Sequence, residues 1–281
     1  MTEKENNKWD FMVHMKSACE LDISKSTVAI YARSDGTTTP ELLGTGVLLT
    51  VAGEYFLTTA YHLLAKAKNA SHSLWVATAA KGGMLQALSG LPYVSIDDPL
   101  DVSVMKLPAE VAKALEGRRF LELADLDPGD AQHTGSCYLV MGFPIDNSSA
   151  DGQELYSVAQ PYITVTYGGE SGPVKRSELS KQIVLAFSHT GNIDEKNRNA
   201  EIYRVTGFSG GGAWRLAEAG THIPNWKPEC KRLVAIMHTK DCATNAFIGT
   251  RVGCILHLMA KNWPHLRDAI ANSFGVICWL E

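Results

Sequence analysis

The feature that most restricts the fold of this chain is a succession of short β-forming runs separated by turn residues. β-branched and apolar residues fill each run, while Gly, Pro, Asn and Asp stand between the runs. Many short strands with frequent turns are typical of an all-β barrel or sandwich rather than of alternating β–α–β units. The predicted strands are Ser26–Arg33, Thr45–Val51, Glu54–Thr59, Ser73–Ala77, Val102–Leu107, Cys137–Met141, Tyr162–Tyr167, Gln182–Ala186, Leu233–His238 and Ala246–Gly249.

The two ends of the chain have helical spacing instead. Apolar residues in Lys8–Leu21 predict a short N-terminal helix, and Val252–Lys261 and Pro264–Ser273 predict two C-terminal helices, with Pro264 suited to a first helical turn. The best linker candidate is Ala124–Thr134. We therefore expect an N-terminal extension at residues 1–25, one barrel at 26–130, a second at 131–262 and a helical tail at 263–281.

Composition and charge exclude several classes of partner. The chain has 281 residues and a formal net charge of −4, without the stripe of Lys and Arg that neutralises phosphates, so we expect no nucleic acid. The N-terminus is polar, and no apolar run reaches the roughly 18–20 residues that span a bilayer. The sequence predicts no secretory signal, no membrane partner and a cytoplasmic location.

Six cysteines are scattered along the chain, and no pair has the spacing of a CxxC zinc or redox motif. We expect free thiols in a reducing compartment, with no metal and no cofactor. The cysteines are Cys19, Cys137, Cys230, Cys242, Cys254 and Cys278.

Three short motifs carry groups with catalytic chemistry. In Leu57–Leu64 (LTTAYHLL), a strand runs into His62 behind small residues, which places the imidazole at a strand end. In Asp98–Leu107 (DPLDVSVMKL), Asp101 heads a near-alternating strand and can turn inward to accept a proton from an imidazole. Taken alone, a structural histidine and a turn-capping acid are the simpler interpretations of these two residues.

The third motif is Gly207–Trp214 (GFSGGGAW). Its glycines allow a tight loop, in part with positive φ, whose backbone N–H groups converge on one point. Such a point is an oxyanion hole, and Ser209 in its middle is placed for attack on a carbonyl. Gly-rich loops also serve as plain turns, so this motif is also not decisive alone.

Together the three motifs resemble those of trypsin/chymotrypsin-like serine peptidases. TTAYHLL is similar to the family's TAAHC-type histidine box, LDVSVMKL to its acid box and GFSGGGAW to its G-[DN]-S-G-G-P serine box, in the family's order. The segments at 44–49, 140–144 and 233–236 also resemble family strands. The resemblance covers residues 26 to 262.

The resemblance implies a double six-stranded β-barrel of the chymotrypsin type, with the active site between the barrels. It implies that Ser209 is the nucleophile, His62 its base and Asp101 the orienting acid. The N–H groups of Gly207 and Ser209 would hold the oxyanion. The expected function is that of a serine endopeptidase acting on a protein or peptide substrate.

The chain departs from the family at several positions. Phe208 stands where digestive trypsins carry the Asp that pairs with a newly cut N-terminus, so activation by N-terminal cleavage is not expected; HtrA-type relatives also lack that Asp. Gly212 replaces the usual Pro, and Tyr61 a small residue. These changes leave open whether the oxyanion loop is preformed or is ordered by an activating protein partner.

Substrate specificity has two interpretations. The resemblance puts His238, Thr239 and Lys240 on the strand that lines the P1 pocket, with Arg204 on the opposite wall. A His and an Arg facing one cavity would favour Glu, Asp or Gln at P1 through charge-assisted hydrogen bonds. A register shifted by one residue instead places His238 beside Asp101 and leaves Arg204 on the surface.

Rival classes remain. The run from Gly207 to Gly211 also satisfies the G-x-S-x-G pattern of α/β-hydrolases, but the following glycines are a poor helix start, and that fold orders its triad Ser, acid, His. A non-catalytic or latent binding module on the same barrel is an alternative, since the presence of three residues does not prove their geometry. A third hypothesis concerns role: a signalling or defence peptidase that cuts one dedicated protein, docked at residues 8–21 or 218–232.

Overall fold

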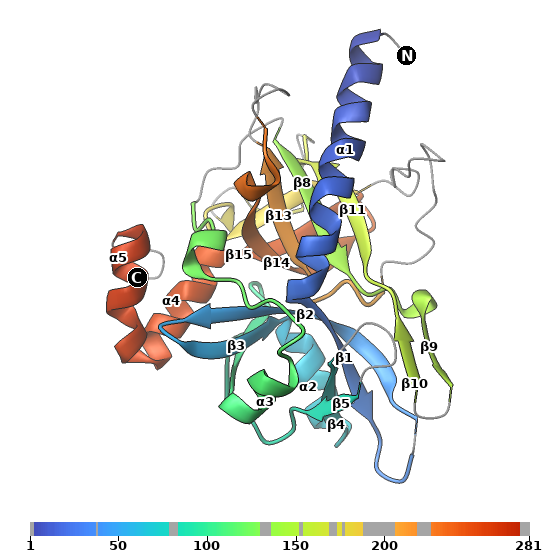
Figure 1. The fold of residues 1–281 in the computed structure, drawn as a ribbon, viewed down its shortest axis with the longest axis vertical. Coiled ribbons are helices and arrows are strands. Elements are labelled where there is room, and N and C mark those ends of the chain that lie inside the picture. The colour runs from blue at the N-terminus through green and yellow to red at the C-terminus, as the bar shows by residue number, and fades with distance from the viewer. Residues whose placement is uncertain are drawn as a thin grey trace.

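The computed structural model describes residues 3–37, 39–78, 84–129, 136–151, 154–168, 173–175, 178–187, 206–217 and 226–275. These residues form two large antiparallel sheets with helices at both ends of the chain (Figure 1). The expected all-β class with terminal helices is confirmed.

The first sheet contains the strands before residue 108. In its described residues the strand order is β5-β4-β1-β2-β3-β7-β6, and every neighbouring pair is antiparallel. Helix α2 (Tyr61–Asn69) follows directly on β3, and α3 (Ala109–Ala114) follows β7. The strands are β1 (Thr27–Arg33), β2 (Glu41–Val51), β3 (Glu54–Thr59), β4 (Ser73–Ala77), β5 (Leu85–Ala87), β6 (Tyr93–Ile96) and β7 (Val102–Leu107).

The second sheet has the order β11-β8-β13-β14-β15-β12. A bridge between Thr166 and Leu185 joins the ends of its two outer strands, so the sheet curls back on itself. A separate hairpin is formed by β9 (Ser148–Asp151) and β10 (Glu154–Ser157), and Ser157 hydrogen-bonds Tyr31 on β1 of the first sheet. The sheet strands are β8 (Cys137–Gly142), β11 (Gln160–Val165), β12 (Gln182–Ala186), β13 (Gly212–Ala217), β14 (Arg232–Asp241) and β15 (Ala246–Arg251).

Within the described residues, the first sheet has seven strands where six were expected. Two edge strands were missed in the sequence, β5 with three residues and β6 with four, because each is too short to show a clear strand pattern. The predicted strands at 54–59, 73–77, 102–107 and 182–186 have the observed bounds.

The N-terminal helix is longer than the predicted Lys8–Leu21: α1 spans Glu3–Ser26. Its buried residues Met12, Met15, Cys19 and Ile23 recur at helical spacing and belong to the main hydrophobic core. In the last turn Ser26 Oγ donates to the Ile23 carbonyl at 2.9 Å, and Asp22 pairs with Arg119.

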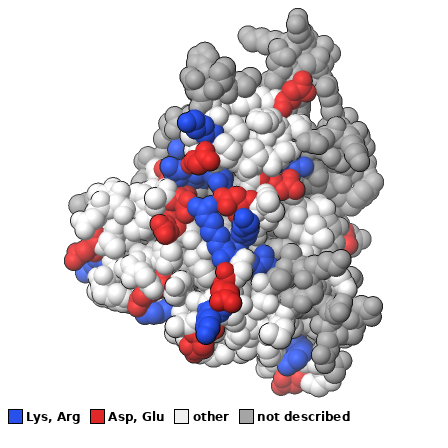
Figure 2. Space-filling model, in the orientation of Figure 1, with Lys and Arg blue, Asp and Glu red and all other residues white. Residues whose placement is uncertain are grey.

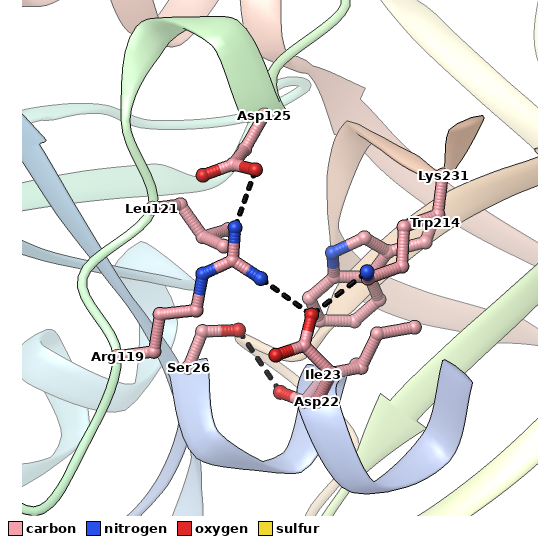
Figure 3. Close-up of a pocket in the computed structure, with 8 residues that line it drawn as sticks. All are labelled: Asp22, Ile23, Ser26, Arg119, Leu121, Asp125, Trp214 and Lys231. Atoms are coloured by element: carbon pink, nitrogen blue, oxygen red, sulfur yellow. Dashed lines mark hydrogen bonds and ion pairs between the residues drawn. The ribbon is translucent and has the colours of Figure 1, made fainter. Parts of the chain in front are cut away.

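A small pocket beside the C-terminal end of α1 shows how the helix is attached (Figure 3). The Asp22 carboxylate accepts a hydrogen bond from Arg119 and pairs with Lys231 Nζ at 2.7 Å. Arg119 also reaches Asp125 at 2.6 Å. Since Arg119 follows α3 and Lys231 precedes β14, α1 is tied to both halves of the chain. Figure 2 shows acidic and basic side chains intermixed in the band that crosses the middle of this face.

The C-terminal helices are α4 (Val252–Asn262) and α5 (Arg267–Phe274), joined by a 3₁₀ turn at Pro264–Leu266. Helix α4 begins directly after β15 and packs against strands of both sheets. No helix in the described part of the chain is long and apolar enough to cross a membrane.

Candidate active site

The site is built from three segments, two on the first sheet and one on the second. His62 is the second residue of α2, directly behind β3, and Asp101 immediately precedes β7. Ser209 lies in the glycine-rich turn before β13. Because β3 and β7 are neighbours in the sheet, the histidine and the acid emerge side by side.

Asp101 hydrogen-bonds both the ring and the backbone of His62. Its Oδ2 accepts a hydrogen bond from the ring Nδ1 at 2.6 Å, and its Oδ1 accepts the backbone N–H of His62 at 2.8 Å. The Asp101 carbonyl also accepts the N–H of Tyr61 at 3.2 Å. These bonds satisfy N–H groups that the first turn of α2 leaves free. The same acid thus caps the helix and holds the Nδ1–H tautomer of the ring.

The ionisation of Asp101 follows from these bonds. Burial, the largest single influence, raises its pKa, but the hydrogen bonds from the His62 ring and backbone outweigh burial, and the pKa lies below its ordinary value. Asp101 is therefore a carboxylate at neutral pH. The His62 side chain is 45% exposed.

The turn that carries Asp101 is held by the second sheet. Gln182 on β12 donates from Nε2 to the Pro99 carbonyl at 2.6 Å, and Thr250 on β15 donates from its hydroxyl to the Leu100 carbonyl. Asp101 precedes a strand of the first sheet, but residues of the second sheet hydrogen-bond the carbonyls of Pro99 and Leu100, the two residues before it.

The serine loop requires glycine for steric reasons. Gly207 has φ +103°, and a Cβ there would lie 2.2 Å from the Phe143 carbonyl oxygen. Gly210 has φ +85°, and a Cβ there would lie 1.9 Å from the Thr45 carbonyl oxygen. No other residue type fits this backbone without movement.

The direction of two N–H groups follows from the carbonyls that precede them. The Thr206 carbonyl accepts the N–H of Ile145 at 2.9 Å, and the Phe208 carbonyl accepts that of Gly211 at 2.8 Å. In a trans peptide the N–H points opposite to its carbonyl, so the N–H groups of Gly207 and Ser209 are turned away from these bonds. Within the described residues neither donates to a backbone acceptor. They are therefore available to an oxyanion.

The Ser209 hydroxyl donates to the His238 carbonyl at 3.2 Å. In the described part of the chain, no hydrogen bond joins it to His62.

His238 occupies the second of the two positions that the sequence left open. Its side chain is 4% exposed, and Nδ1 lies 4.0 Å from Asp101 Oδ2 and 3.0 Å from the Thr239 hydroxyl. Burial, the largest influence, lowers its pKa to about 4, against the opposite effect of the Asp101 carboxylate. His238 is thus a buried neutral ring beside Asp101, and a role for it in binding a P1 side chain stays a prediction.

The remaining predicted pocket residues are placed as follows. Thr239 is exposed at the end of β14, and Lys240 Nζ lies 4.1 Å from the centre of the Phe187 ring, a cation–π contact. Arg204 lies outside the described residues. Phe208, which replaces the trypsin Asp, is 3% exposed and stacks on Phe247. Apolar packing holds the serine loop where digestive trypsins use an ion pair.

The other groups that could carry chemistry are metal ligands and thiols. Among the residues that the structure describes, no group of three or more His, Cys, Asp or Glu side chains is placed to hold a metal ion. Burial raises the pKa of Cys19 and Cys254 to about 11. These two thiols are therefore poor nucleophiles.

Comparison with known proteins supports the fold. No protein-family model and no curated protein matches the chain. The structure of a serine endoprotease from Yersinia pestis aligns over 92% of this chain and 67% of its own, with 15% identity and a TM-score of 0.51. The fold is chymotrypsin-like. A structure from work on the coupled folding and binding of the Sesbania mosaic virus VPg protein aligns over 85% of this chain and 90% of its own, with 15% identity and a TM-score of 0.45.

At 15% identity the endoprotease shares the chymotrypsin-like fold with this chain, and a fold does not by itself imply an activity. Three residues whose side chains hydrogen-bond the backbone of the site segments were not recognised from the sequence. They are Gln182, Thr250 and Thr45, and the last stands between Gly44 and Gly46, a pairing that signals close backbone approach.

Proposed function

We propose that the protein is a serine endopeptidase in which Ser209, His62 and Asp101 form the catalytic triad. The observation that carries the proposal is the double contact of Asp101 with His62, combined with the outward N–H groups of Gly207 and Ser209. A turn cap explains the first arrangement alone and a plain glycine turn the second. Their joint presence on a chymotrypsin-like fold supports acyl transfer, for which the Ser209 hydroxyl must also contact His62.

The proposed reaction begins with rotation of the Ser209 hydroxyl from the His238 carbonyl to His62 Nε2. Ser209 Oγ then attacks the scissile carbonyl while its proton passes to Nε2, and the N–H groups of Gly207 and Ser209 receive the oxyanion. His62 returns the proton to the leaving amine, and water attacks the acyl-enzyme by the same route. Asp101 stays ionised throughout and stabilises the imidazolium.

For substrate preference we propose an acidic or Gln side chain at P1, now supported by Lys240 rather than by His238. Lys240 is half-buried at the end of β14 with its ammonium over Phe187. Cleavage of a peptide library that varies only at P1 tests this preference. A clear preference for Arg, Lys or large apolar residues contradicts it.

A second candidate function is a latent or non-catalytic module. The hydrogen bond from the Ser209 hydroxyl to the His238 carbonyl favours it, because a nucleophile in this rotamer is not activated by His62. In this case an activating protein partner or the substrate itself would have to reorient Ser209.

The test is labelling of the purified protein with a fluorophosphonate probe, with the modified residue located by mass spectrometry. We expect labelling of wild type at Ser209 and none in Ser209→Ala or His62→Ala, with all three proteins folded by circular dichroism. Ser24→Ala, which removes a half-buried helical serine away from the site, is the matched control and should label like wild type. Folded wild type that stays unlabelled contradicts the proposal and favours the latent module.

A further inference from the structure

We propose that Thr45 is a positioning residue that locks the serine loop in the orientation required of an oxyanion hole. The proposal rests on the peptidase function above. Thr45 is on β2 of the first sheet, whereas the loop it contacts belongs to the second sheet. Nothing in the three sequence motifs includes it.

The Thr45 hydroxyl makes two bonds to the second sheet. It donates to the Gly207 carbonyl at 2.6 Å and accepts the N–H of Phe143 at 2.9 Å. The residue is fully buried, so no water competes for either bond. One hydroxyl therefore connects the start of the serine loop to the segment that follows β8.

The backbone of Thr45 completes the contact. Its N–H donates to the Ser209 carbonyl at 2.9 Å, and its own carbonyl accepts the Thr59 hydroxyl at 2.7 Å. Thr45 thus holds the carbonyls of Gly207 and Ser209 from one side, while Thr59 on β3 holds Thr45 in place. Along the chain the Ser209 N–H lies between these two anchored carbonyls, and the Gly207 N–H directly precedes the first.

The hydrogen bonds from Thr45 are needed because the loop requires glycine at position 207. Gly207 lacks a Cβ, so the peptides on either side of it rotate at low cost and its N–H can turn away from a substrate. Ile145 holds the preceding peptide through the Thr206 carbonyl, and Thr45 holds the following one through the Gly207 carbonyl. With both peptides held, the N–H of Gly207 keeps one direction.

If Thr45 has this role, removing its hydroxyl should lower the reactivity of Ser209 more than it lowers the stability of the fold. Thr45→Val keeps the shape of the side chain but leaves the Gly207 carbonyl and the Phe143 N–H without the hydroxyl. Losing one oxyanion donor typically lowers rates by about 10²–10³-fold, and a mobile donor should lose at least about 10-fold. Thr45→Ser retains the hydroxyl and should restore the rate to within about 3-fold of wild type.

The matched control is Thr58→Val. Thr58 is equally buried on the neighbouring strand, and its hydroxyl donates to the Val47 carbonyl at 3.2 Å, away from the serine loop. It reports the cost of removing a buried threonine hydroxyl from this sheet. A merely structural role for Thr45 would give both variants the same behaviour.

The experiment measures the maximal rate of fluorophosphonate labelling, the probe concentration for half-maximal rate and the Tm of each variant. We expect Thr45→Val to lower the maximal rate at least about 10-fold with a half-maximal concentration within about 2-fold, and Thr58→Val to leave both unchanged. Equal rates for Thr45→Val and Thr58→Val would overturn the proposal.

If Thr45→Val does not fold, the ratio of Thr45→Ser to Thr45→Ala decides, because both are small and only one carries a hydroxyl. A ratio near one overturns the proposal, and a ratio above about 10 supports it. Failure of wild type to label is a different result: it removes the peptidase function itself, and the role of Thr45 falls with it. Labelled wild type with an unaffected Thr45→Val removes only the role of Thr45.

Discussion

Asp101 uses its two carboxylate oxygens for two different parts of His62, Oδ2 for the ring and Oδ1 for the backbone. One residue thereby sets both the tautomer of the imidazole and the start of the helix that carries it. Asp101 itself adopts φ +44°, a left-handed conformation that Asp tolerates better than most residues. The geometry of the acid and the geometry of the base are not independent.

The first prediction concerns this carboxylate. Asp101→Asn keeps the side-chain shape but can donate from its amide, which favours the wrong ring tautomer and removes the charge that stabilises an imidazolium. We expect labelling of Ser209 to fall by about 10³–10⁴-fold, as in other triads. Measured under the same conditions, Asp98→Asn, an exposed neighbour in the same turn, should label at the wild-type rate; an equal loss there would assign the effect to the turn.

The serine loop supplies the second prediction. Gly207→Ala adds a Cβ that would lie 2.2 Å from the Phe143 carbonyl in a backbone of φ +103°. We expect destabilisation beyond the about 1–2 kcal/mol of a left-handed alanine, measured by urea unfolding. Gly53→Ala has φ +78° with nothing within 4 Å and should show only the backbone cost. Similar values for the two variants would mean that the loop relaxes around the added atom.

The third prediction concerns Phe208, which stands where digestive trypsins carry an ion-paired Asp. Phe208→Asp would bury a carboxylate in the aromatic cluster that includes Tyr162 and Phe247. An unpaired buried charge should cost about 3–5 kcal/mol or prevent folding, whereas Phe208→Leu should cost less than about 1.5 kcal/mol. Thermal unfolding checks both. A stable Phe208→Asp protein would indicate that a cation is within reach of the loop.

The fourth prediction links pH to the attachment of α1. Burial is the largest influence on Asp22 and raises its pKa, but the hydrogen bond and charge of Lys231 and the charge of Arg119 bring the pKa below its ordinary value of 3.8. A depressed pKa contributes stability that is present above pH 3.8 and is lost as the pH falls through the folded-state value.

Asp22→Asn should therefore be less stable than wild type at pH 7 by about 1 kcal/mol, since the group is partly exposed and its pairs are screened. The difference should shrink toward zero in the acid range, as measured by urea unfolding at several pH values. Glu20→Gln, which removes a different carboxylate from the same helix, is the control variant. A difference between Asp22→Asn and wild type that persists in acid would mean that the carboxylate acts through packing rather than charge.

Much of the fold and the three motifs could be predicted from the sequence. The strands at 54–59 and 102–107 have the predicted bounds because a run of β-forming residues between turn residues is a local signal. Glycines at 207 and 210 mark the loop for a similarly local reason, since only glycine fits their φ angles and contacts. The extension of α1 beyond Leu21 was missed because its last turn is polar and is stabilised by packing and ion pairs.

The position of His238 could not be predicted in this way. The pairing of β14 with β15 shifts by one residue between Met237 and Thr239, which makes His238 the extra residue of a β-bulge and turns its ring toward Asp101. A shift of one residue exchanges the faces of a strand, and it depends on the partner strand rather than on the local sequence.

The sequence by itself therefore determined most of the strands, the identity of the candidate triad and the need for glycine in the serine loop. Only the tertiary structure decided which groups hold that triad. Gln182 and Thr250 support the turn of Asp101 from the opposite sheet, and Thr45 supports the loop of Ser209 in return. These contacts join residues far apart in the chain, so their energies depend on how two sheets dock and leave no periodic signal in either segment.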